Sequence, residues 1–320
     1  MPSMDKRRDL TVITHARDAA AGLAKLLPTV RWATEVVVID MQSTDDTVAV
    51  ARAAGARVLS TPVHPRVDSI RTRYLEEAKT DWIFVLDADE YLADDAPEAV
   101  DRLLAEKGAG YDAFALPRFN RIGSHIMRSS GWYPDHQVRL FRRGCVRWPD
   151  ATHRAPEVLT GAHRLYLLPL NGLHIHHDNY ANLRAVIERQ LRYALQDAYD
   201  PAAFDADHYA SAAYAEFARR HDPAADGDLS RALATVMAWD KVMRGLIHWD
   251  QLDPKPPLDT FLTLPVAVAQ RDLERELAEA RQVIAEREAT IQSLLGTRVL
   301  RLCRQVDRLR ARLRLGRKPE

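Results

Sequence analysis

The sequence predicts an α/β fold built on a largely parallel sheet. Short apolar runs rich in β-branched residues alternate with segments of helical periodicity; the runs are 10–14, 35–40, 57–60 and 82–86. Strands that alternate with helices are joined by right-handed crossovers, which make neighbouring strands parallel. Two of the runs end in, or are followed by, aspartates. Carboxylates at the carboxyl ends of such strands lie where open α/β sheets bind ligands.

Local signals place helices between these strands. The predicted helices are 19–27, 45–54 and 68–78. Pro28 is expected to end the first helix, because proline cannot continue the hydrogen-bond ladder. Ser43 or Thr44 is expected to cap the second helix, since hydroxyl side chains accept hydrogen bonds from the free N–H groups of a first turn.

The most informative motif is Asp87-Ala88-Asp89-Glu90, directly after the strand 82–86. Two aspartates one residue apart can put at least one oxygen on a hard divalent cation, which proteins usually hold with one or two carboxylates and substrate phosphates. An acidic surface loop has the same composition. The strand before the motif, and Asp40 at the same predicted sheet edge, favour a nucleotide that lies with its base near Asp40 and its phosphates near Asp89.

Composition narrows the function. The chain of 320 residues has 45 basic and 45 acidic side chains, so its net charge gives no reason to expect nucleic acid as a partner. Cys145 and Cys303 are far apart and lack the surroundings of a nucleophile, which fits a reducing cytosol. The first ten residues have no apolar export signal, and no run approaches a membrane span. A cytoplasmic protein is expected.

Three segments in order, 36–47, 81–90 and 131–143, resemble family 2 glycosyltransferases of the GT-A fold. The third, Gly-Trp-Tyr-Pro-Asp-His-Gln-Val-Arg-Leu-Phe-Arg-Arg, is similar to the branch that includes lipopolysaccharide-core β-glucosyltransferases. The resemblance covers about residues 8–195. It implies a GT-A nucleotide-diphospho-sugar transferase fold, a nucleotide-sugar donor and a divalent cation, Mn²⁺ or Mg²⁺.

The resemblance has three departures. His15-Ala16-Arg17-Asp18 stands where the branch usually has Lys-Asn-Glu-Glu, Arg71-Thr72 where a basic residue precedes Asn, and His153-Arg154 where His-Glu is common. The first departure leaves the nucleotide base open. The other two leave the acceptor and phosphate contacts open.

The resemblance and the chemistry give each candidate residue a role. Donor-binding candidates are Asp40, Arg71, Asp87 and Arg139, and metal-binding candidates are Asp89 and His176. Asp40 would accept a hydrogen bond from the base, Asp87 would bind ribose or the metal through water, and both arginines would contact phosphate. Each of three candidates also has a structural alternative. Asp40 could serve in a turn or a helix cap, Arg71 could be a solvated helix residue, and His176 could belong to the core.

Asp135 is the candidate general base for the acceptor hydroxyl. It lies in an aromatic, partly apolar loop before a strand, where the pKa of a carboxylate is expected to rise. Trp132 and Tyr133 in the same loop would stack on the acceptor's sugar ring. A Pro-Asp turn, with the aromatic residues packed beneath the loop, is the competing interpretation. One carboxylate base assisting direct displacement implies inversion at the anomeric carbon.

These roles predict an inverting glycosyltransferase that moves a sugar, UDP-hexose being the expected donor, to a hydroxyl of a cell-envelope glycan, glycolipid or similar acceptor. A sugar nucleotidyltransferase is one alternative, although residues 14–18 lack the glycines of a phosphate-cradling loop. A non-catalytic coiled-coil scaffold with a degenerate transferase domain is the other, although Asp87, Asp89 and Asp135 are all retained.

The predicted domains are a catalytic domain over 1–180, a helical extension over 181–253, a linker over 254–265, and a coiled coil with a basic helix over 266–320. Apolar residues from Leu273 to Leu294 recur at spacings of three, four and seven, which favours a homo-oligomeric coiled coil. Residues 298–318 hold nine basic side chains and one acid. Such a helix is typical of peripheral binding to anionic lipid at the inner face of the cytoplasmic membrane. The two interpretations are compatible.

Overall fold

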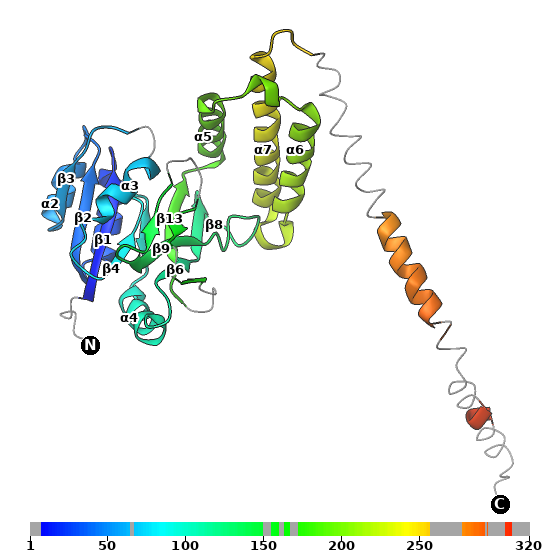
Figure 1. The fold of residues 1–320 in the computed structure, drawn as a ribbon, viewed down its shortest axis with the longest axis horizontal. Coiled ribbons are helices and arrows are strands. Elements are labelled where there is room, and N and C mark those ends of the chain that lie inside the picture. The colour runs from blue at the N-terminus through cyan, green and yellow to red at the C-terminus, as the bar shows by residue number, and fades with distance from the viewer. Residues whose placement is uncertain are drawn as a thin grey trace, which may run out of the picture. The chain divides into compact units, whose positions relative to one another are not determined.

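The computed structural model describes residues 8–64, 67–149, 155–159, 163–166, 172–256, 277–291, 293 and 305–308. The α/β class with a mostly parallel sheet, followed by helices, is confirmed (Figure 1). The chain divides into two compact units, Met1–Ala198 with Ala215–Met243, and Tyr199–Tyr214 with Arg244–Glu320.

The central sheet of the first unit has the strand order β12-β6-β9-β4-β1-β2-β3. Its strands are β1 Arg8–Ala16, β2 Ala33–Asp40, β3 Arg57–Ser60, β4 Trp82–Val85, β6 Ala113–Leu116, β9 Gln137–Arg142 and β12 Arg164–Tyr166. β9 runs antiparallel to β4 and β6, and the other neighbouring pairs are parallel. The carboxyl ends of β1, β2 and β4 therefore meet at one edge.

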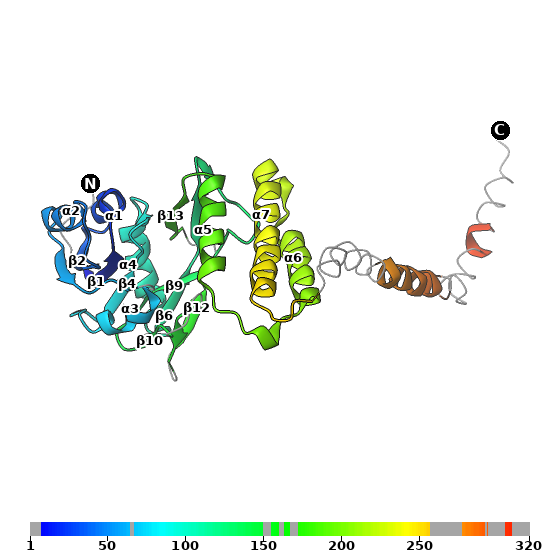
Figure 2. The ribbon, with the colours of Figure 1, turned by 90° about the horizontal axis from the view of Figure 1, so that it is seen from above.

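Helices cover both faces of this sheet (Figure 2). The helices are α1 Ala20–Thr29, α2 Thr47–Ala53, α3 Asp68–Leu75 and α4 Ala96–Lys107. α1, α2 and α4 share one apolar core with Phe84, whereas α3 shares a second core with Ile83 and Val85. Successive residues of β4 point to opposite faces, so a strand buried on both faces is apolar throughout.

A smaller sheet with the order β5-β13-β7-β8 adjoins the strand ends. Its strands are β5 Glu90–Leu92, β7 Arg118–Ile122, β8 His125–Ile126 and β13 Ile175–Tyr180. His177 pairs with Glu90 and Asn120 across β13, whereas His176 pairs with Tyr91 and Phe119. The side chains paired with His177 and those paired with His176 lie on opposite faces of the sheet, because side chains alternate along a strand. A two-stranded ribbon, β10 Val146–Arg147 and β11 Glu157–Val158, completes the described strands.

The helices that follow are α5 Leu183–Gln196, the 3₁₀ turn η2 Pro201–Ala203, α6 Ala206–Arg220 and α7 Pro223–Asp250, which is kinked at Gly227. In the first unit, Leu233 and Met237 of α7 pack with Trp132 and Val186 in a third apolar core. In the second unit, His248 is buried and forms hydrogen bonds with the Asp200 carbonyl and the Tyr209 hydroxyl.

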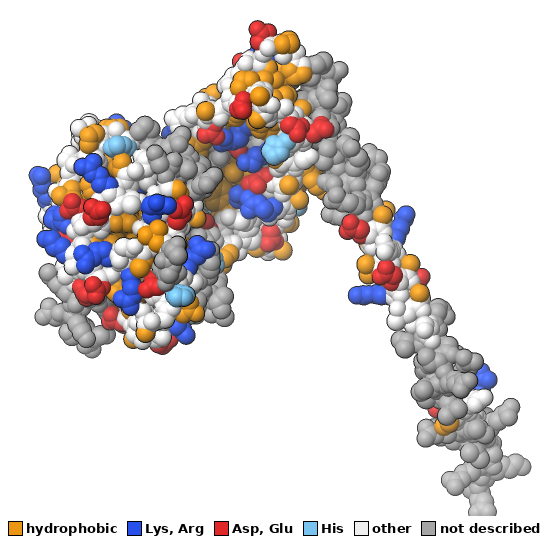
Figure 3. Space-filling model, in the orientation of Figure 1, with side chains coloured by type: hydrophobic (Ala, Val, Ile, Leu, Met, Phe, Trp, Pro, Cys, Tyr) orange, Lys and Arg blue, Asp and Glu red, His pale blue; other side chains and the backbone are white. Residues whose placement is uncertain are grey.

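Acidic and basic side chains are interspersed over the visible face of the sheet-containing part (Figure 3), in keeping with the formal charge of zero. Among the described residues, no helix is long and apolar enough to cross a membrane.

Two local predictions were wrong. α1 continues through Pro28 and ends one residue later, at Thr29, so the proline interrupts the hydrogen-bond ladder only in the last turn. α2 begins at Thr47 without a side-chain cap from Ser43 or Thr44. Instead, the Ser43 hydroxyl accepts a hydrogen bond from the Asp18 N–H.

Parts of the predicted C-terminal region fall outside the described residues, as do residues 167–171, which follow β12. Within the expected coiled coil, residues 277–291 are helical, and Leu277, Ile284 and Ile291 are exposed. The oligomer, the basic membrane-binding helix and the domain boundaries stay predictions.

Candidate functional site

The site lies where parallel strands end. Asp40 is the last residue of β2 and pairs with Ala16 of β1, while Asp87 follows β4 on the other side of β1. Asp40 is buried, and its Oδ1 accepts a hydrogen bond from the Ser43 N–H at 3.2 Å. The turn role that the sequence left open for Asp40 is therefore present, and its position at the nucleotide edge is retained.

His15 is also buried at this edge, at the end of β1, where it meets the ring of Tyr74 edge-on. Burial, assisted by the charge of Arg71, lowers the pKa of His15 to about 3. The imidazole is neutral at physiological pH, so it adds no positive charge to the nucleotide edge.

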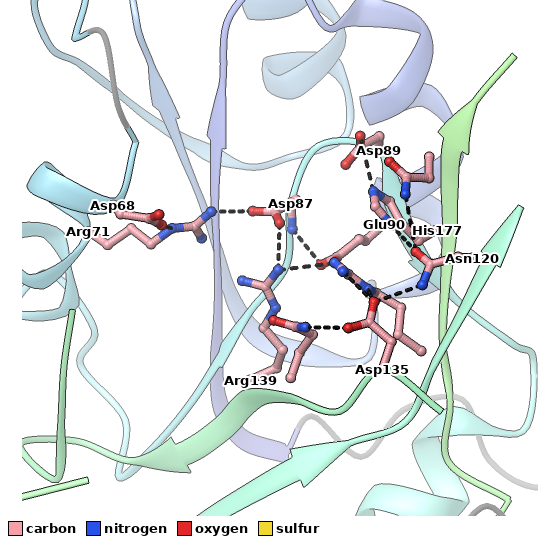
Figure 4. A network of polar contacts seen from close by, with 12 residues as sticks. Asp68, Arg71, Asp87, Asp89, Glu90, Asn120, Asp135, Arg139 and His177 are labelled. Carbon is pink, nitrogen blue, oxygen red and sulfur yellow. Dashed lines mark hydrogen bonds and ion pairs between the residues drawn. The ribbon is translucent and has the colours of Figure 1, made fainter. Parts of the chain in front are cut away.

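Asp87 lies between two arginines (Figure 4). One carboxylate oxygen accepts a hydrogen bond from Arg71, and the other accepts one from Arg139. Burial raises the pKa of Asp87, but the charges of Arg139 and Arg71 outweigh it and hold this pKa well below the usual value. With both oxygens engaged, Asp87 orients the two arginines, which differs from the expected contact with ribose or a metal-bound water.

Glu90 is fully buried and joins three parts of the site. Its Oε2 accepts a hydrogen bond from the Asp87 backbone N–H at 2.9 Å. Its Oε1 accepts hydrogen bonds from Arg118 Nη1 at 2.8 Å and from Arg139 Nη2 at 3.1 Å. A buried carboxylate is tolerated only when it is paired in this way. The carboxylate therefore connects the acidic loop to β7 and β9.

Asp135 receives four hydrogen bonds from three side chains. Its Oδ2 accepts bonds from Arg118 Nε and Nη2, at 2.9 and 2.6 Å, and from Asn120 Nδ2 at 2.7 Å. Its Oδ1 accepts one bond, from Gln137 Nε2 at 3.0 Å. Burial raises the pKa of Asp135, but the charge of Arg118 and these hydrogen bonds lower it overall. The expected rise in this pKa was wrong, because the pairing outweighs the apolar loop.

Asp89 faces His177 and not His176. The His177 Nε2 lies 3.3 Å from Asp89 Oδ2, and the Asp89 side chain is 46% exposed. His177 Nδ1 lies 2.7 Å from Asn120 Oδ1. The Asn120 amide nitrogen donates to Asp135 and to the Trp132 carbonyl, so the Oδ1 must accept and His177 Nδ1 must donate. In the neutral imidazole, Nε2 then carries a lone pair directed toward Asp89.

This pair fits a divalent cation. A carboxylate oxygen and an imidazole nitrogen lie side by side, and the other ring nitrogen is fixed by a hydrogen bond, as metal-binding histidines usually are. Within the part of the chain that the structure describes, no group of three or more potential ligands is present. Water and substrate oxygens would have to supply the remaining coordination.

His176 lies on the other face of β13, stacked on Tyr91 with ring centroids 5.2 Å apart. Trp132 is buried in the third apolar core and meets Tyr180 edge-on, so the expectation that it stacks on a sugar ring was wrong. Tyr133 is half-buried and is stacked on Phe119.

A cavity of about 430 Å³ adjoins these groups. Its lining includes Arg71, Asp87, Arg118, Arg139, Trp148 and Arg164. Asp68 lines the cavity as well, so four guanidinium groups outnumber two carboxylates in the lining, which suits an anionic ligand such as a diphosphate. The structure thus brings together Arg71, Asp87 and Arg139 of the predicted set, and it places Asp89 and Asp135 on either side of Asn120 and His177.

Sequence reasoning assigned no role to Glu90, Arg118, Asn120 or His177. Arg118 and Asn120 alternate along β7, a period that marks one strand face, but the sequence does not show which partner strand they meet. Glu90 belongs to the acidic motif 87–90, and nothing in the sequence indicates that its side chain is fully buried.

Residues 11–156 match the family model described as Glycosyl transferase family 2. A Rickettsia felis protein named "Uncharacterized glycosyltransferase" is 34% identical over 92 residues, which cover 28% of this chain and 31% of that protein. A protein of the same name from Rickettsia bellii is 31% identical over 107 residues, covering 32% of this chain and 35% of that protein. The chain spans about a third of the length of these curated relatives.

The chain is also similar to a solved structure of glucosyl-3-phosphoglycerate synthase from Mycobacterium tuberculosis in complex with Mn²⁺, UDP and glucosyl-3-phosphoglycerate. The two chains are 27% identical, and the match covers 35% of this chain and 44% of the other, with a TM-score of 0.29.

Proposed function

Because residues 11–156 match the family model described as Glycosyl transferase family 2, we propose that this chain is a family 2 glycosyltransferase. It would transfer a hexose from UDP to a hydroxyl group of a cell-envelope glycan or glycolipid, with inversion. The observation that carries this proposal is the polar network that connects Asp87, Glu90 and Asp135 through Arg118 and Arg139. The network fixes an anion-binding wall and a carboxylate base relative to each other.

The donor diphosphate would lie against Arg71 and Arg139, which Asp87 orients from between them. Asp89 and His177 would hold Mn²⁺ or Mg²⁺. When bound, the cation would neutralise charge that develops on the departing diphosphate. In this proposal, His177 replaces His176, the metal-binding candidate predicted from the sequence.

Asp135 would accept the proton of the acceptor hydroxyl. Its lowered pKa keeps the carboxylate ionised. Within the described part of the chain, its Oδ1 accepts a hydrogen bond from Gln137 alone, which leaves lone pairs for a substrate O–H. Arg118 and Asn120 hold the other oxygen, so the carboxylate cannot rotate freely. Direct displacement assisted by one base would give a β-linkage from an α-linked donor.

Location and assembly are part of the same proposal. The enzyme would act in the cytoplasm on a lipid-linked or surface-glycan precursor at the inner leaflet, and the exposed apolar positions Leu277, Ile284 and Ile291 would pair with a second copy of the chain.

The proposal is tested by incubating the full chain with Mn²⁺ and a panel of nucleotide sugars and measuring release of the nucleoside diphosphate. We expect one UDP-hexose to be turned over, and Asp89→Ala to abolish both turnover and metal-dependent UDP binding. If the wild-type chain neither binds UDP with metal nor turns over any donor, the proposal is wrong.

A further inference from the structure

The face of the small sheet opposite the catalytic network carries a row of aromatic rings. Tyr91 of β5, His176 of β13 and Phe119 of β7 are direct cross-strand neighbours. Glu90, His177 and Asn120 are the adjacent residues in the chain and point to the network side. The same three strands therefore present charged groups on one face and rings on the other.

The rings contact one another in a continuous row. His176 lies parallel to Tyr91 at 5.2 Å and is tilted against Phe119 at 5.5 Å. Tyr133 and His174 lie parallel to Phe119, with ring centroids 5.1 and 4.1 Å from it. The Tyr133 hydroxyl and His174 Nε2 are hydrogen-bonded at 3.2 Å, and their ring planes differ by 13°. Tyr133 and His174 are thus neighbours in one layer on the same side of Phe119.

All five rings, Tyr91, Phe119, Tyr133, His174 and His176, are half-buried. Aromatic pairs of this kind stabilise a fold. A packing role alone, however, does not require five aromatic side chains in one row, each of them partly exposed.

Charged groups border this row. The Asp178 carboxylate receives Lys25 Nζ at 2.6 Å and Arg121 Nε at 3.3 Å, and Arg128 lies over the Phe119 ring at 5.5 Å. Tyr91, Lys25 and Asp178 line a cavity of about 200 Å³, and Asp89 lines it as well. The row is therefore continuous at this end with the proposed metal site, while at the other end Tyr133 lies two residues before Asp135.

From this placement we infer that the aromatic row, Tyr91, His176, Phe119, His174 and Tyr133, is a saccharide-binding platform for the part of the acceptor glycan remote from the reacting hydroxyl. This inference rests on the proposed function, because only a transferase has an acceptor substrate. Sugar rings place C–H groups against aromatic rings and hydroxyls toward charged side chains, and this row of partly exposed rings has charged side chains at its border. An acyl chain would match the rings but not the charged border.

A remote platform has a consequence for the reaction. Binding energy from sugar rings that do not react can orient the acceptor at Asp135, so its loss should lower transfer to an oligosaccharide more than transfer to a short acceptor.

The inference is tested by saturation-transfer difference NMR on the full chain without donor, using methyl β-D-glucopyranoside, methyl β-D-galactopyranoside and uridine as probes. We expect saturation of the sugar C–H protons in the wild-type protein and its loss in Phe119→Ala and in Tyr133→Ala. Tyr133→Phe keeps the ring and should keep the signal. Trp239→Ala removes an aromatic side chain that is 53% exposed on α7 and should also leave the signal unchanged.

Melting temperature and Mn²⁺-dependent UDP affinity show whether each variant is folded. If Phe119→Ala does not fold, Tyr133→Ala and Tyr91→Ala carry the test. Absence of sugar signals in a wild-type protein that turns over UDP-hexose would overturn the platform and leave the proposed function intact. Sugar signals that depend on Phe119 in a protein without donor turnover would support the platform and contradict the proposed function. Saturation of uridine alone through these residues would overturn the platform.

Discussion

Arg118 Nη2 lies 2.6 Å from Asp135 Oδ2, and the same guanidinium reaches Glu90 through its other terminal nitrogen at 2.8 Å. One arginine therefore links the proposed base to the buried end of the acidic motif. Arg118 is a positioning residue in this account, since it acts on substrate through Asp135.

The first prediction concerns the acidity of Asp135. Arg118→Gln removes the charge that lowers the pKa of this carboxylate, so the pKa should rise and the acidic limb of the kcat/KM profile should move to higher pH. Arg184→Gln, which breaks an exposed ion pair with Glu188, is the matched control and should leave the profile in place. If the pH profile of Arg118→Gln is identical to that of the wild type, Arg118 does not set the pKa of the catalytic carboxylate.

The pair of Arg118 and Asp135 also makes the free energy of unfolding depend on pH. The folded pKa of Asp135 is lower than its unfolded value, so the pair stabilises the fold above the unfolded pKa of about 3.9, and this stabilisation is lost as pH falls through the folded pKa. In Arg118→Gln, Glu90 also loses a partner in a buried site, a change that costs about 3–5 kcal/mol in comparable pairs. Chemical denaturation between pH 3 and pH 7 measures the pH-dependent stabilisation and the loss at Glu90. These limits lie about one unit below and about three units above the unfolded pKa of Asp135.

The second prediction separates two neighbouring histidines. His177→Ala should weaken Mn²⁺-dependent UDP binding, because Nε2 is the atom beside Asp89, whereas His176→Ala should leave it unchanged, because its ring lies on the opposite face. Isothermal titration with UDP, with and without Mn²⁺, makes the comparison. Equal losses in the two variants, or a loss only in His176→Ala, would remove His177 from the proposed site.

The third prediction concerns the loop that carries Asp135. Asp226 is buried and accepts hydrogen bonds from the Arg128 and Ser129 N–H groups and from the Ser129 hydroxyl, at 2.8 to 2.9 Å. Asp226→Ala leaves these donors without partners, each at a cost of about 1–3 kcal/mol. We expect a lower melting temperature and a lower kcat, with UDP affinity unchanged. Asp228→Ala, on an almost fully exposed side chain, is the control.

Much of the fold could be predicted because its signals are local. Apolar runs such as 82–86 and the helical periods between them identify a parallel α/β sheet in order, and the strand ends then locate Asp40 and Asp87. The antiparallel placement of β9 between β4 and β6 depends on long-range pairing, for which the sequence carries no local signal.

The site was harder to predict for the same reason. The acidity of Asp135, which lies in a loop, depends on Arg118 and Asn120, which lie 17 and 15 residues earlier on β7. The choice between His176 and His177 depends on which face of β13 meets Asp89, and a shift of one residue reverses it. Trp132 looked available for stacking because its burial beneath α7 requires residues about a hundred positions later.

The central claim is that Asp135 removes the acceptor proton, and single-turnover transfer by Asp135→Asn tests it most directly. Asparagine preserves the size of the side chain but cannot accept the proton as a carboxylate does. With Mn²⁺-dependent UDP affinity unchanged, the account predicts that the transfer rate falls by about 10²-fold or more. Transfer at close to the wild-type rate would contradict it and place the base elsewhere.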